Sequence, residues 1–382
     1  MSGKSRIIQA AFALIMTSLS LTGCAARQPA REPINAQMPP LSAGRNPTVL
    51  VCPLDTLSDD EGVVWLSLSL APQMRRDLFC VQQISVIPSA DTTVPLKAYF
   101  LNEHGITKLA RAHGADVAVL GMMRREEDMV AVDLQAYDLK SKIFLLKTTV
   151  MEKPTHIFKL ERALVYQLIE ALGIQLTEEE KDRIESSRPR KIQAAVEYGR
   201  GLTFEQKEDF TEALMAYDSA IFADDNFAVP YADQARIYHR YNSPLRAMES
   251  YENAVARDEF FAEAWYHLNL YAAEYKNDNQ AAVKYCRKAL DIAPRFGKAR
   301  LSLGARLYMV GDLEGAIEET NVAVSLLPTS ALARYNLGIF YARSGKPEEA
   351  RTWFNQALAL DPDFEYAREE LRKLDAELAP LR

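Results

Sequence analysis

The chain has 382 residues, enough for two or three domains, and 48% of them are hydrophobic, which excludes a wholly disordered chain. Its 45 Lys and Arg residues against 52 Asp and Glu residues give a formal charge of −7, so it lacks the overall basic field of a protein that wraps nucleic acid. We therefore expect no nucleic-acid partner. Four Cys residues in this length also exclude a fold built on disulfides.

Residues 1–23 have the pattern of a signal peptide, because Lys4 and Arg6 precede an apolar run that ends shortly before Cys24. Residues 21–24, Leu-Thr-Gly-Cys, resemble the lipobox of bacterial lipoproteins. That resemblance implies that Cys24 becomes a lipidated N-terminus. It also implies an anchor in the outer membrane, facing the periplasm, since Ala25 stands where the inner-membrane retention signal has Asp. An ordinary secretory signal or an uncleaved anchor helix is the alternative.

Residues 24–47 have the composition of a tether. They contain five Pro and no aromatic residue, so they cannot bury a core of their own. We expect an extended Pro-rich segment between the anchor and the folded part of the chain.

Residues 48–188 have the pattern of a small α/β domain with a mixed sheet. Strands are expected at 48–52, 84–87, 116–123, 129–137 and 142–150, and helices at 63–79, 106–113, 157–174 and 177–187. The last three strands follow one another after short turns, so they should form an antiparallel meander. Pro72 fits the first turn of a helix capped by Ser69, which predicts a break in the first helix. Thr177 and Glu180 predict a capping box.

The order of these elements resembles the TolB amino-terminal-like domain, a family that includes flagellar outer-membrane lipoproteins of the FlgO type. The similarity lies in LVCPLDTLSDDEGVVWLSLSLAPQM (50–74), GADVAVLGMMRREEDMVAVDLQAYDLKSKIFLL (114–146) and IEALGIQLTEEEKDRI (169–184). The chain departs from the family at Cys52, where an aliphatic residue is usual, and at 138–142, where many relatives have a Gly. The resemblance implies a recognition domain of the cell envelope without catalytic residues.

An internal repeat fills the second half of the chain. Alanines recur every 34 or 35 residues, and a second Ala follows each of them by seven residues; the first set is Ala213, Ala247, Ala282, Ala316 and Ala350. This pattern resembles the tetratricopeptide repeat family across 194–364. It predicts an all-α solenoid of five repeats, at 194–227, 228–261, 262–296, 297–330 and 331–364. Small residues at Gly201, Ala235, Gly304 and Gly338 should let the two helices of a pair cross closely, and 365–382 should supply a capping helix and tail.

The first helix of each repeat lines the concave face of such a solenoid. The residues that we expect to hold a protein or peptide partner there are Tyr198, Leu202, Arg236, His239, Tyr266, Leu270, Lys298, Leu301, Tyr308, Tyr335 and Ile339. Glu205, Val229 and Leu332 stand at equivalent positions. Apolar and aromatic side chains predominate, which favours an apolar peptide over the terminal carboxylate that co-chaperone repeats clamp. The alternative is that the aromatic residues pack against neighbouring helices or the α/β domain.

Motifs for catalysis, metal binding or a cofactor are missing. The five His residues form no HExxH pair, and no GxGxxG, GxxxxGK[ST] or GxSxG occurs. We therefore expect no enzyme, no metal and no cofactor. Cys286 replaces an aromatic repeat residue and should be buried and inert. Cys52 and Cys80 are a possible disulfide pair, with two separate buried thiols as the alternative.

These patterns predict a lipid-anchored adaptor or assembly factor for an envelope machine such as a flagellum, a pilus or an export system. The alternative is a lipoprotein that senses a ligand through its α/β domain. A partner retained by the repeats would favour the first function, and a bound small molecule the second.

Overall fold

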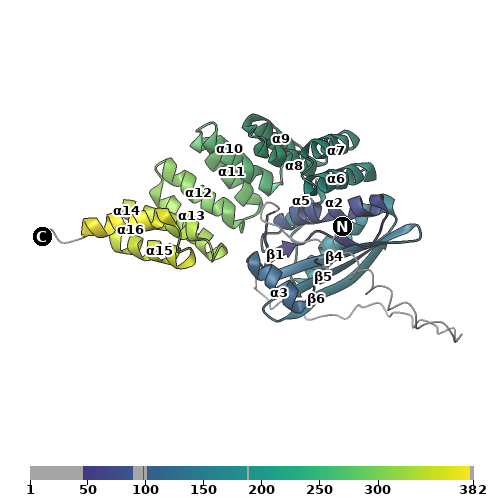
Figure 1. The fold of residues 1–382 in the computed structure, drawn as a ribbon, viewed down its shortest axis with the longest axis horizontal. Helices are drawn as coiled ribbons and strands as arrows, with labels where there is room; N and C mark the ends of the chain where they lie inside the picture. The colour runs from purple at the N-terminus through teal and green to yellow at the C-terminus, as the bar shows by residue number, and fades with distance from the viewer. Residues whose placement is uncertain (1–45, 89–97, 99–100, 187–188, 379–382) are drawn as a thin grey trace, which may run out of the picture. The chain divides into compact units, whose positions relative to one another are not determined.

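The computed structural model describes residues 46–88, 98, 101–186 and 189–378. The predicted signal peptide, Cys24 and most of the predicted tether lie outside these residues. The described residues belong to one compact unit, Ala36–Arg382, which contains a sheet part followed by a helical part (Figure 1). The boundary that we place between these parts, at 188–194, stays a prediction.

A mixed sheet forms the first part, as predicted. Its strands are β1 (Thr48–Val51), β2 (Asp55–Thr56), β3 (Ser85–Val86), β4 (Val117–Glu126), β5 (Met129–Asp138) and β6 (Ile143–Glu152). The order is β3-β1-β4-β5-β6, with β2 paired to β4. β1 pairs in parallel with β3 and β4, whereas β4, β5 and β6 form the predicted antiparallel meander. The alternation of apolar residues along β5 puts Val130, Val132 and Leu134 into one core cluster.

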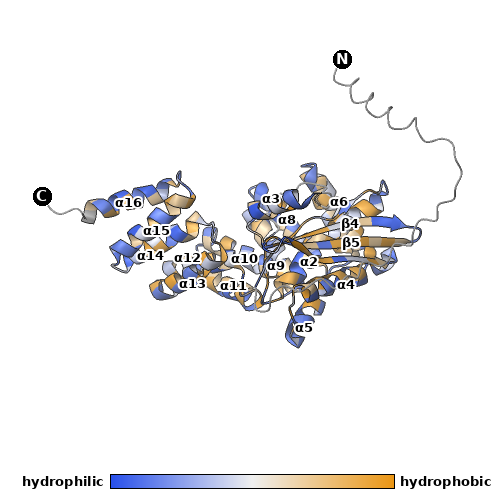
Figure 2. Ribbon diagram, turned by 90° about the horizontal axis from the view of Figure 1, so that it is seen from below, coloured by the Kyte–Doolittle hydropathy of each residue, from blue (hydrophilic) through white to orange (hydrophobic). Residues whose placement is uncertain are grey.

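Helices cover both faces of the sheet. α2 (Glu61–Phe79) and α4 (Ile157–Ala171) share a core cluster with the side chains of one face, including Val49 and Val119. α3 (Glu103–Ala112) packs on the other face, where Leu50, Ala118 and Tyr137 are buried. Figure 2 shows hydrophobic residues running along β4, β5 and α4. Alternate residues of β1 therefore point to opposite faces of the sheet and belong to two separate hydrophobic cores.

The predicted break at Pro72 is wrong, because α2 continues through it from Glu61 to Phe79. Ser69 does not cap a helix; its hydroxyl is buried and donates to the Leu66 carbonyl oxygen at 2.8 Å. Pro72 removes one backbone donor, but burial of the helix on all sides compensates for that loss.

The predicted capping box of α5 (Glu178–Ser186) is confirmed. The Glu180 amide donates to the Thr177 hydroxyl at 3.2 Å, and the Thr177 amide donates to the Glu180 carboxylate at 2.8 Å. Glu180 is only 3% exposed, because its other carboxylate oxygen accepts a hydrogen bond from the Gln82 amide at 2.9 Å. The box thus also ties α5 to the chain that follows α2.

Five antiparallel helix pairs and a final helix make up residues 192–378. They are α6 (Ile192–Gln206) with α7 (Phe210–Ala223), α8 (Ala228–Arg240) with α9 (Pro244–Arg257), α10 (Ala262–Glu274) with α11 (Asn279–Ile292), α12 (Gly297–Met309) with α13 (Leu313–Leu326), α14 (Ala331–Arg343) with α15 (Pro347–Leu360), and α16 (Glu365–Leu378). A methyl group at Gly201, Gly304 or Gly338 would lie 2.1–2.4 Å from a side-chain atom of the paired helix. The predicted close crossings are confirmed at these three pairs.

Within the described part of the chain, no helix combines the length and the apolar character that are needed to cross a membrane.

Candidate functional site

Helix α2 lies between the sheet and the repeats and is buried by both. Val63, Leu66, Leu70, Met74 and Leu78 join the core cluster on the sheet. A second stripe, spaced at Trp65, Leu68, Pro72, Arg76 and Phe79, meets the repeats. Because these two stripes lie on different sides of one helix, α2 belongs to the α/β fold and also fills part of the concave face of the repeats.

The closest approach joins α2 to α6. A methyl group added at Gly199 would lie 1.8 Å from the Trp65 carbonyl oxygen, far inside van der Waals contact. Only glycine lets the two backbones come this near. Gly199 is therefore required for the docking of α2 and not for the pairing of α6 with α7, which depends on Gly201.

A buried ion pair fixes the other end of α2. Arg76 donates from Nε and Nη2 to the two carboxylate oxygens of Asp258, at 2.5 and 2.7 Å, just after α9. Its Nη1 donates to Asp77 and to the Arg183 carbonyl oxygen, both at 3.0 Å. Burial acts to lower the pKa of the Arg76 guanidinium, but the adjacent Asp258 outweighs this, so the pKa lies well above its usual value. Arg76 therefore stays a cation within this interface.

Further contacts carry this interface into the third and fourth repeats. The Phe79 and Phe296 ring centroids are 5.0 Å apart, and the Ser85 hydroxyl donates to the Arg295 carbonyl oxygen at 3.3 Å. From α5, Arg183 Nη1 donates to the Asp291 carbonyl oxygen at 3.2 Å. One hydrophobic cluster consequently runs from the sheet into α11 and α12.

The first two repeats carry a network of charged groups beneath α2. Arg236 lies 2.8 Å from Glu205 and 3.1 Å from Asp233. Tyr217 donates to Glu205 at 2.7 Å, and Tyr198 donates to Asp233 at 2.5 Å. Burial, followed by the charge of Asp233, raises the pKa of both phenols well above its usual value, so they remain donors. Both carboxylates thus have a cation and a hydroxyl as partners.

The predicted partner-binding residues fall into four groups. Tyr198 is fully buried and is not available to a partner, which corrects that prediction. Leu202 and Arg236 line a pocket against α2, and Tyr266 packs on Phe296, with its ring centroid at 5.1 Å. The residues on repeats four and five are all half-buried; they are Lys298, Leu301, Tyr308, Tyr335 and Ile339. The alternative that the aromatic residues pack within the chain holds in every repeat that has one, since Tyr308 packs on Phe340 and Tyr335 on Phe354 and Phe364.

The last two predicted residues, His239 and Leu270, lie on α8 and α10. His239 is exposed, and its ring meets the edge of Tyr271 with centroids 5.8 Å apart. Leu270 is half-buried on α10. Next to these, burial and the nearby charges of Arg236 and Lys298 lower the pKa of His267 to about 3, so that this imidazole is neutral at physiological pH.

The possible disulfide is not formed. Cys52 and Cys80 are free thiols in two different hydrophobic clusters, on opposite faces of the sheet. Burial raises the pKa of each thiol to about 12, which leaves both protonated and unreactive. Cys286 is likewise a buried free thiol in the core of the third repeat. Among the residues that the structure describes, no group of three or more His, Cys, Asp or Glu side chains could hold a metal ion.

Comparison with known proteins identifies the repeats. Models of the tetratricopeptide repeat family match residues 262–296 and 331–364, which are the third and fifth predicted repeats. The repeat prediction is confirmed there. Such arrays present extended concave binding surfaces, so the match supports a protein–protein interaction adaptor.

Curated proteins with similar sequences are much longer than the matched region. The chain is 28% identical over 171 residues to human Protein O-mannosyl-transferase TMTC3, covering 44% of this chain and 19% of that protein. It is 29% identical over 114 residues to the TPR repeat-containing protein MJ1428 of Methanocaldococcus jannaschii, covering 30% and 20%. The chain thus spans about a fifth of the length of these two relatives.

Solved structures of repeat proteins are also similar. YrrB, described as a TPR protein with an unusual peptide-binding site, is 22% identical, with a TM-score of 0.42 over 47% of this chain and 92% of YrrB. MamA is 26% identical, with a TM-score of 0.39 over 45% of this chain and 96% of MamA.

Proposed function

We propose that the chain is a protein-binding adaptor that holds an apolar peptide segment of its partner on repeats four and five. The observation that carries this proposal is the division of the concave face. α2 covers the face of the first repeats through Gly199 and Asp258, whereas large apolar side chains on α14 and α16 stay in solvent. Leu332 is 50% exposed and Tyr366 is 68% exposed.

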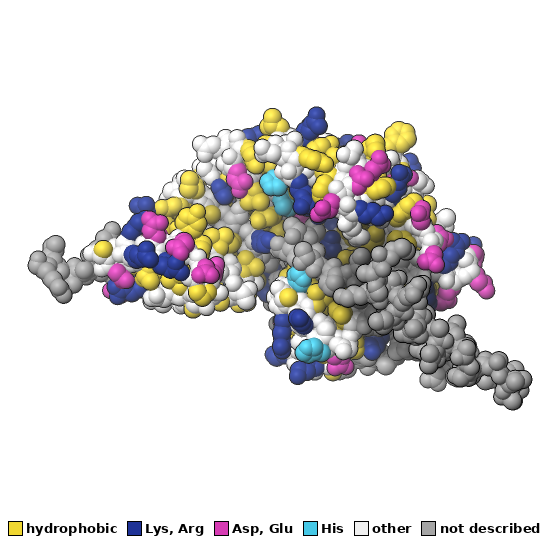
Figure 3. Space-filling view, viewed as in Figure 1, with side chains coloured by type: hydrophobic (Ala, Val, Ile, Leu, Met, Phe, Trp, Pro, Cys, Tyr) yellow, Lys and Arg dark blue, Asp and Glu magenta, His cyan; other side chains and the backbone are white. Residues whose placement is uncertain are grey.

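The exposed apolar side chains on α14 and α16, which we call the open stripe, have the features of a binding surface. Figure 3 shows hydrophobic side chains among charged ones over the α12 to α16 part of the molecule. Tyr335 packs its ring against Phe354 and Phe364, with centroids 5.9 and 5.2 Å away, and so is already held in place. A partner that contacts such a fixed ring loses little side-chain entropy on binding. Apolar contact area is therefore the main source of the expected affinity.

A charge placed on this stripe tests the proposal. Leu332→Glu should weaken partner binding at least about tenfold, because a peptide that covers residue 332 would have to desolvate the new carboxylate. Val322→Glu is the matched control, since Val322 is an exposed apolar residue on α13. The partner is first trapped with a photo-crosslinking residue at 332, and its affinity is then measured by calorimetry. Equal affinities of the two variants, or crosslinking from 322 and not from 332, would refute the groove proposal.

We also propose that the chain is a lipoprotein of the cell envelope, anchored through Cys24 and facing the periplasm. The Leu-Thr-Gly-Cys motif and the TolB amino-terminal-like resemblance of the sheet part support this. The adaptor would then serve an envelope machine and would carry out no catalysis. Cys24→Ser should abolish labelling by a fatty-acid probe and release the protein from the membrane fraction. Unchanged labelling and fractionation would show that the anchor assignment is wrong.

A further inference from the structure

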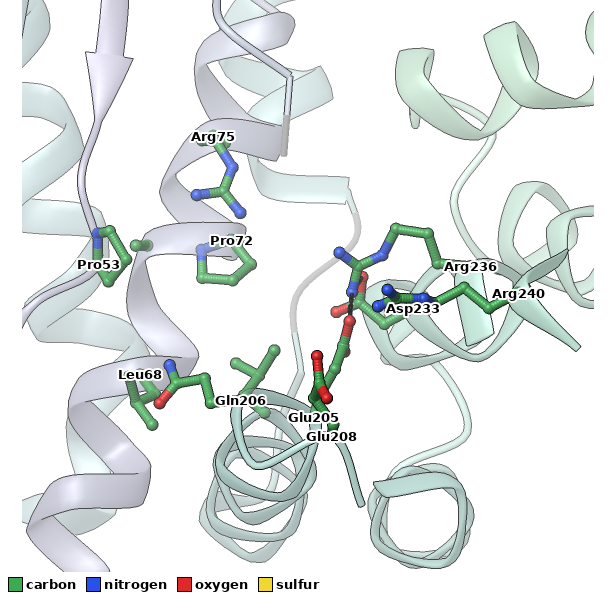
Figure 4. A pocket seen from close by; sticks show the side chains of 12 residues that line it. Pro53, Leu68, Pro72, Arg75, Glu205, Gln206, Glu208, Asp233, Arg236 and Arg240 are labelled. Carbon is green, nitrogen blue, oxygen red and sulfur yellow. Dashed lines mark hydrogen bonds and ion pairs between the residues drawn. The ribbon is translucent and has the colours of Figure 1, made fainter. Parts of the chain in front are cut away.

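A pocket of about 300 Å³ lies at the junction of α2 with α6 and α8 (Figure 4). One wall is apolar and comes mainly from Leu68, Ala71, Pro72 and Leu202. Arg75 lies beside Pro72 on the same helix, and charged residues that include Arg236 form the opposite wall (Figure 4). The size and the mixed lining are those of a small-molecule site.

Arg75 has no partner that accounts for its burial. The side chain is 6% exposed, it lines the pocket, and its Nε atom has no hydrogen-bond partner. Among the described residues, no hydrogen bond or ion pair joins the Arg75 guanidinium to another group. Its neighbour Arg76, equally buried on the same helix, binds Asp258 with two nitrogens. A buried guanidinium without an anion is unfavourable, so a ligand that supplies the anion would bind well.

The carboxylates that line the pocket do not bind the Arg75 guanidinium. Glu205 and Asp233 are both bound by Arg236 and by a tyrosine hydroxyl. Glu208 is exposed, so water screens its charge. Arg240, also in the lining, lies over the Phe210 ring at 4.9 Å and adds a second cation. The lining thus has three cations and three carboxylates, but among the described residues none of these carboxylates is bonded to Arg75, which lies beside the apolar wall.

We propose that this pocket binds a small organic monocarboxylate. The two carboxylate oxygens match the fork of the Arg75 guanidinium, and the aliphatic part of the ligand lies against Leu68, Pro72 and Leu202. Since the pocket is formed by the sheet part and the repeats together, a bound carboxylate would strengthen their contact. The chain would then also be a ligand-sensing protein, which is the second function that the sequence suggests.

Binding of 4-methylpentanoate to the full chain tests this proposal, with the neutral amide of the same acid as the matched probe. Calorimetry should show saturable binding of the carboxylate and at least tenfold weaker binding of the amide. Arg75→Met should abolish carboxylate binding, and Arg75→Lys, which keeps the charge and loses the fork, should weaken it at least tenfold. Arg246→Met, on the outer surface of α9, should bind like the unaltered protein.

Three results would overturn the proposal: no saturable binding of the carboxylate at millimolar concentration, equal binding of carboxylate and amide, or undiminished binding by Arg75→Lys. If Arg75→Met does not fold, carboxylate binding by Arg75→Lys and amide binding by the unaltered protein still test the proposal. None of these measurements depends on the partner groove of repeats four and five, so the two proposals can fail separately.

Discussion

Arg76→Met is expected to lower the free energy of unfolding of the full chain by about 3–5 kcal/mol. The Asp258 carboxylate is 1% exposed and receives two hydrogen bonds from Arg76. Without Arg76 this carboxylate stays buried with its charge uncompensated. The hydrogen bonds from Arg76 to the Arg183 and Ile184 carbonyl oxygens of α5 are lost as well. Urea denaturation followed by circular dichroism measures the change.

Arg75→Met is the matched control, because Arg75 is the adjacent residue, is also buried and forms no ion pair among the described residues. Its replacement should leave stability unchanged or raise it, since it removes an uncompensated charge. The double variant Arg76→Met, Asp258→Leu should recover part of the loss. If Arg76→Met and Arg75→Met unfold at the same urea concentration, the ion pair does not hold α2 on the repeats.

Gly199→Ala is expected to destabilise the chain by at least about 1–3 kcal/mol. The new methyl group meets a backbone carbonyl oxygen at 1.8 Å, and a backbone atom cannot rotate away as a side chain can. The helices α2 and α6 must therefore separate. Hydrogen exchange should show faster exchange in both of these helices, while α12 to α16 keep their protection.

Arg200→Ala is the control for this variant. Arg200 is the next residue of α6; its side chain is 40% exposed and contacts Glu197 and the Phe204 ring of the same helix. We expect a change within about 0.5 kcal/mol. Local protection of α2 in the Gly199→Ala variant equal to that in Arg200→Ala would contradict the close crossing.

Local patterns predicted most of the elements correctly. The alternation along β5, the capping box at Thr177 and the small residues at Gly201 and Gly304 each act within one element or one helix pair. Their physical cause is contained in a short window of sequence, so they could be recognised there. The same is true of the repeats, whose alanines recur because each pair packs in the same way.

The site could not be predicted in the same way. One stripe of α2, with Leu66, Leu70 and Met74, is a normal core stripe and was sufficient to predict a helix. The second stripe gives no separate signal, since Trp65 and Phe79 only widen the apolar surface of a helix that also carries Arg76. That the repeats cover it depends on contacts such as Arg76 with Asp258, which are 182 residues apart. The prediction of a break at Pro72 was wrong for the same reason. Burial of α2 by both the sheet and the repeats outweighs the loss of one backbone donor.

The order in which the chain is made gives the long-range contact of Arg76 with Asp258 a kinetic consequence. At about 5–20 residues per second, synthesis of the 182 residues between them takes roughly 10–40 s. During that interval the nascent chain lacks the repeat surface that covers Leu68, Pro72 and Phe79. We therefore expect this stripe of α2 to be exposed in the nascent chain, where a chaperone that binds apolar helices would recognise it.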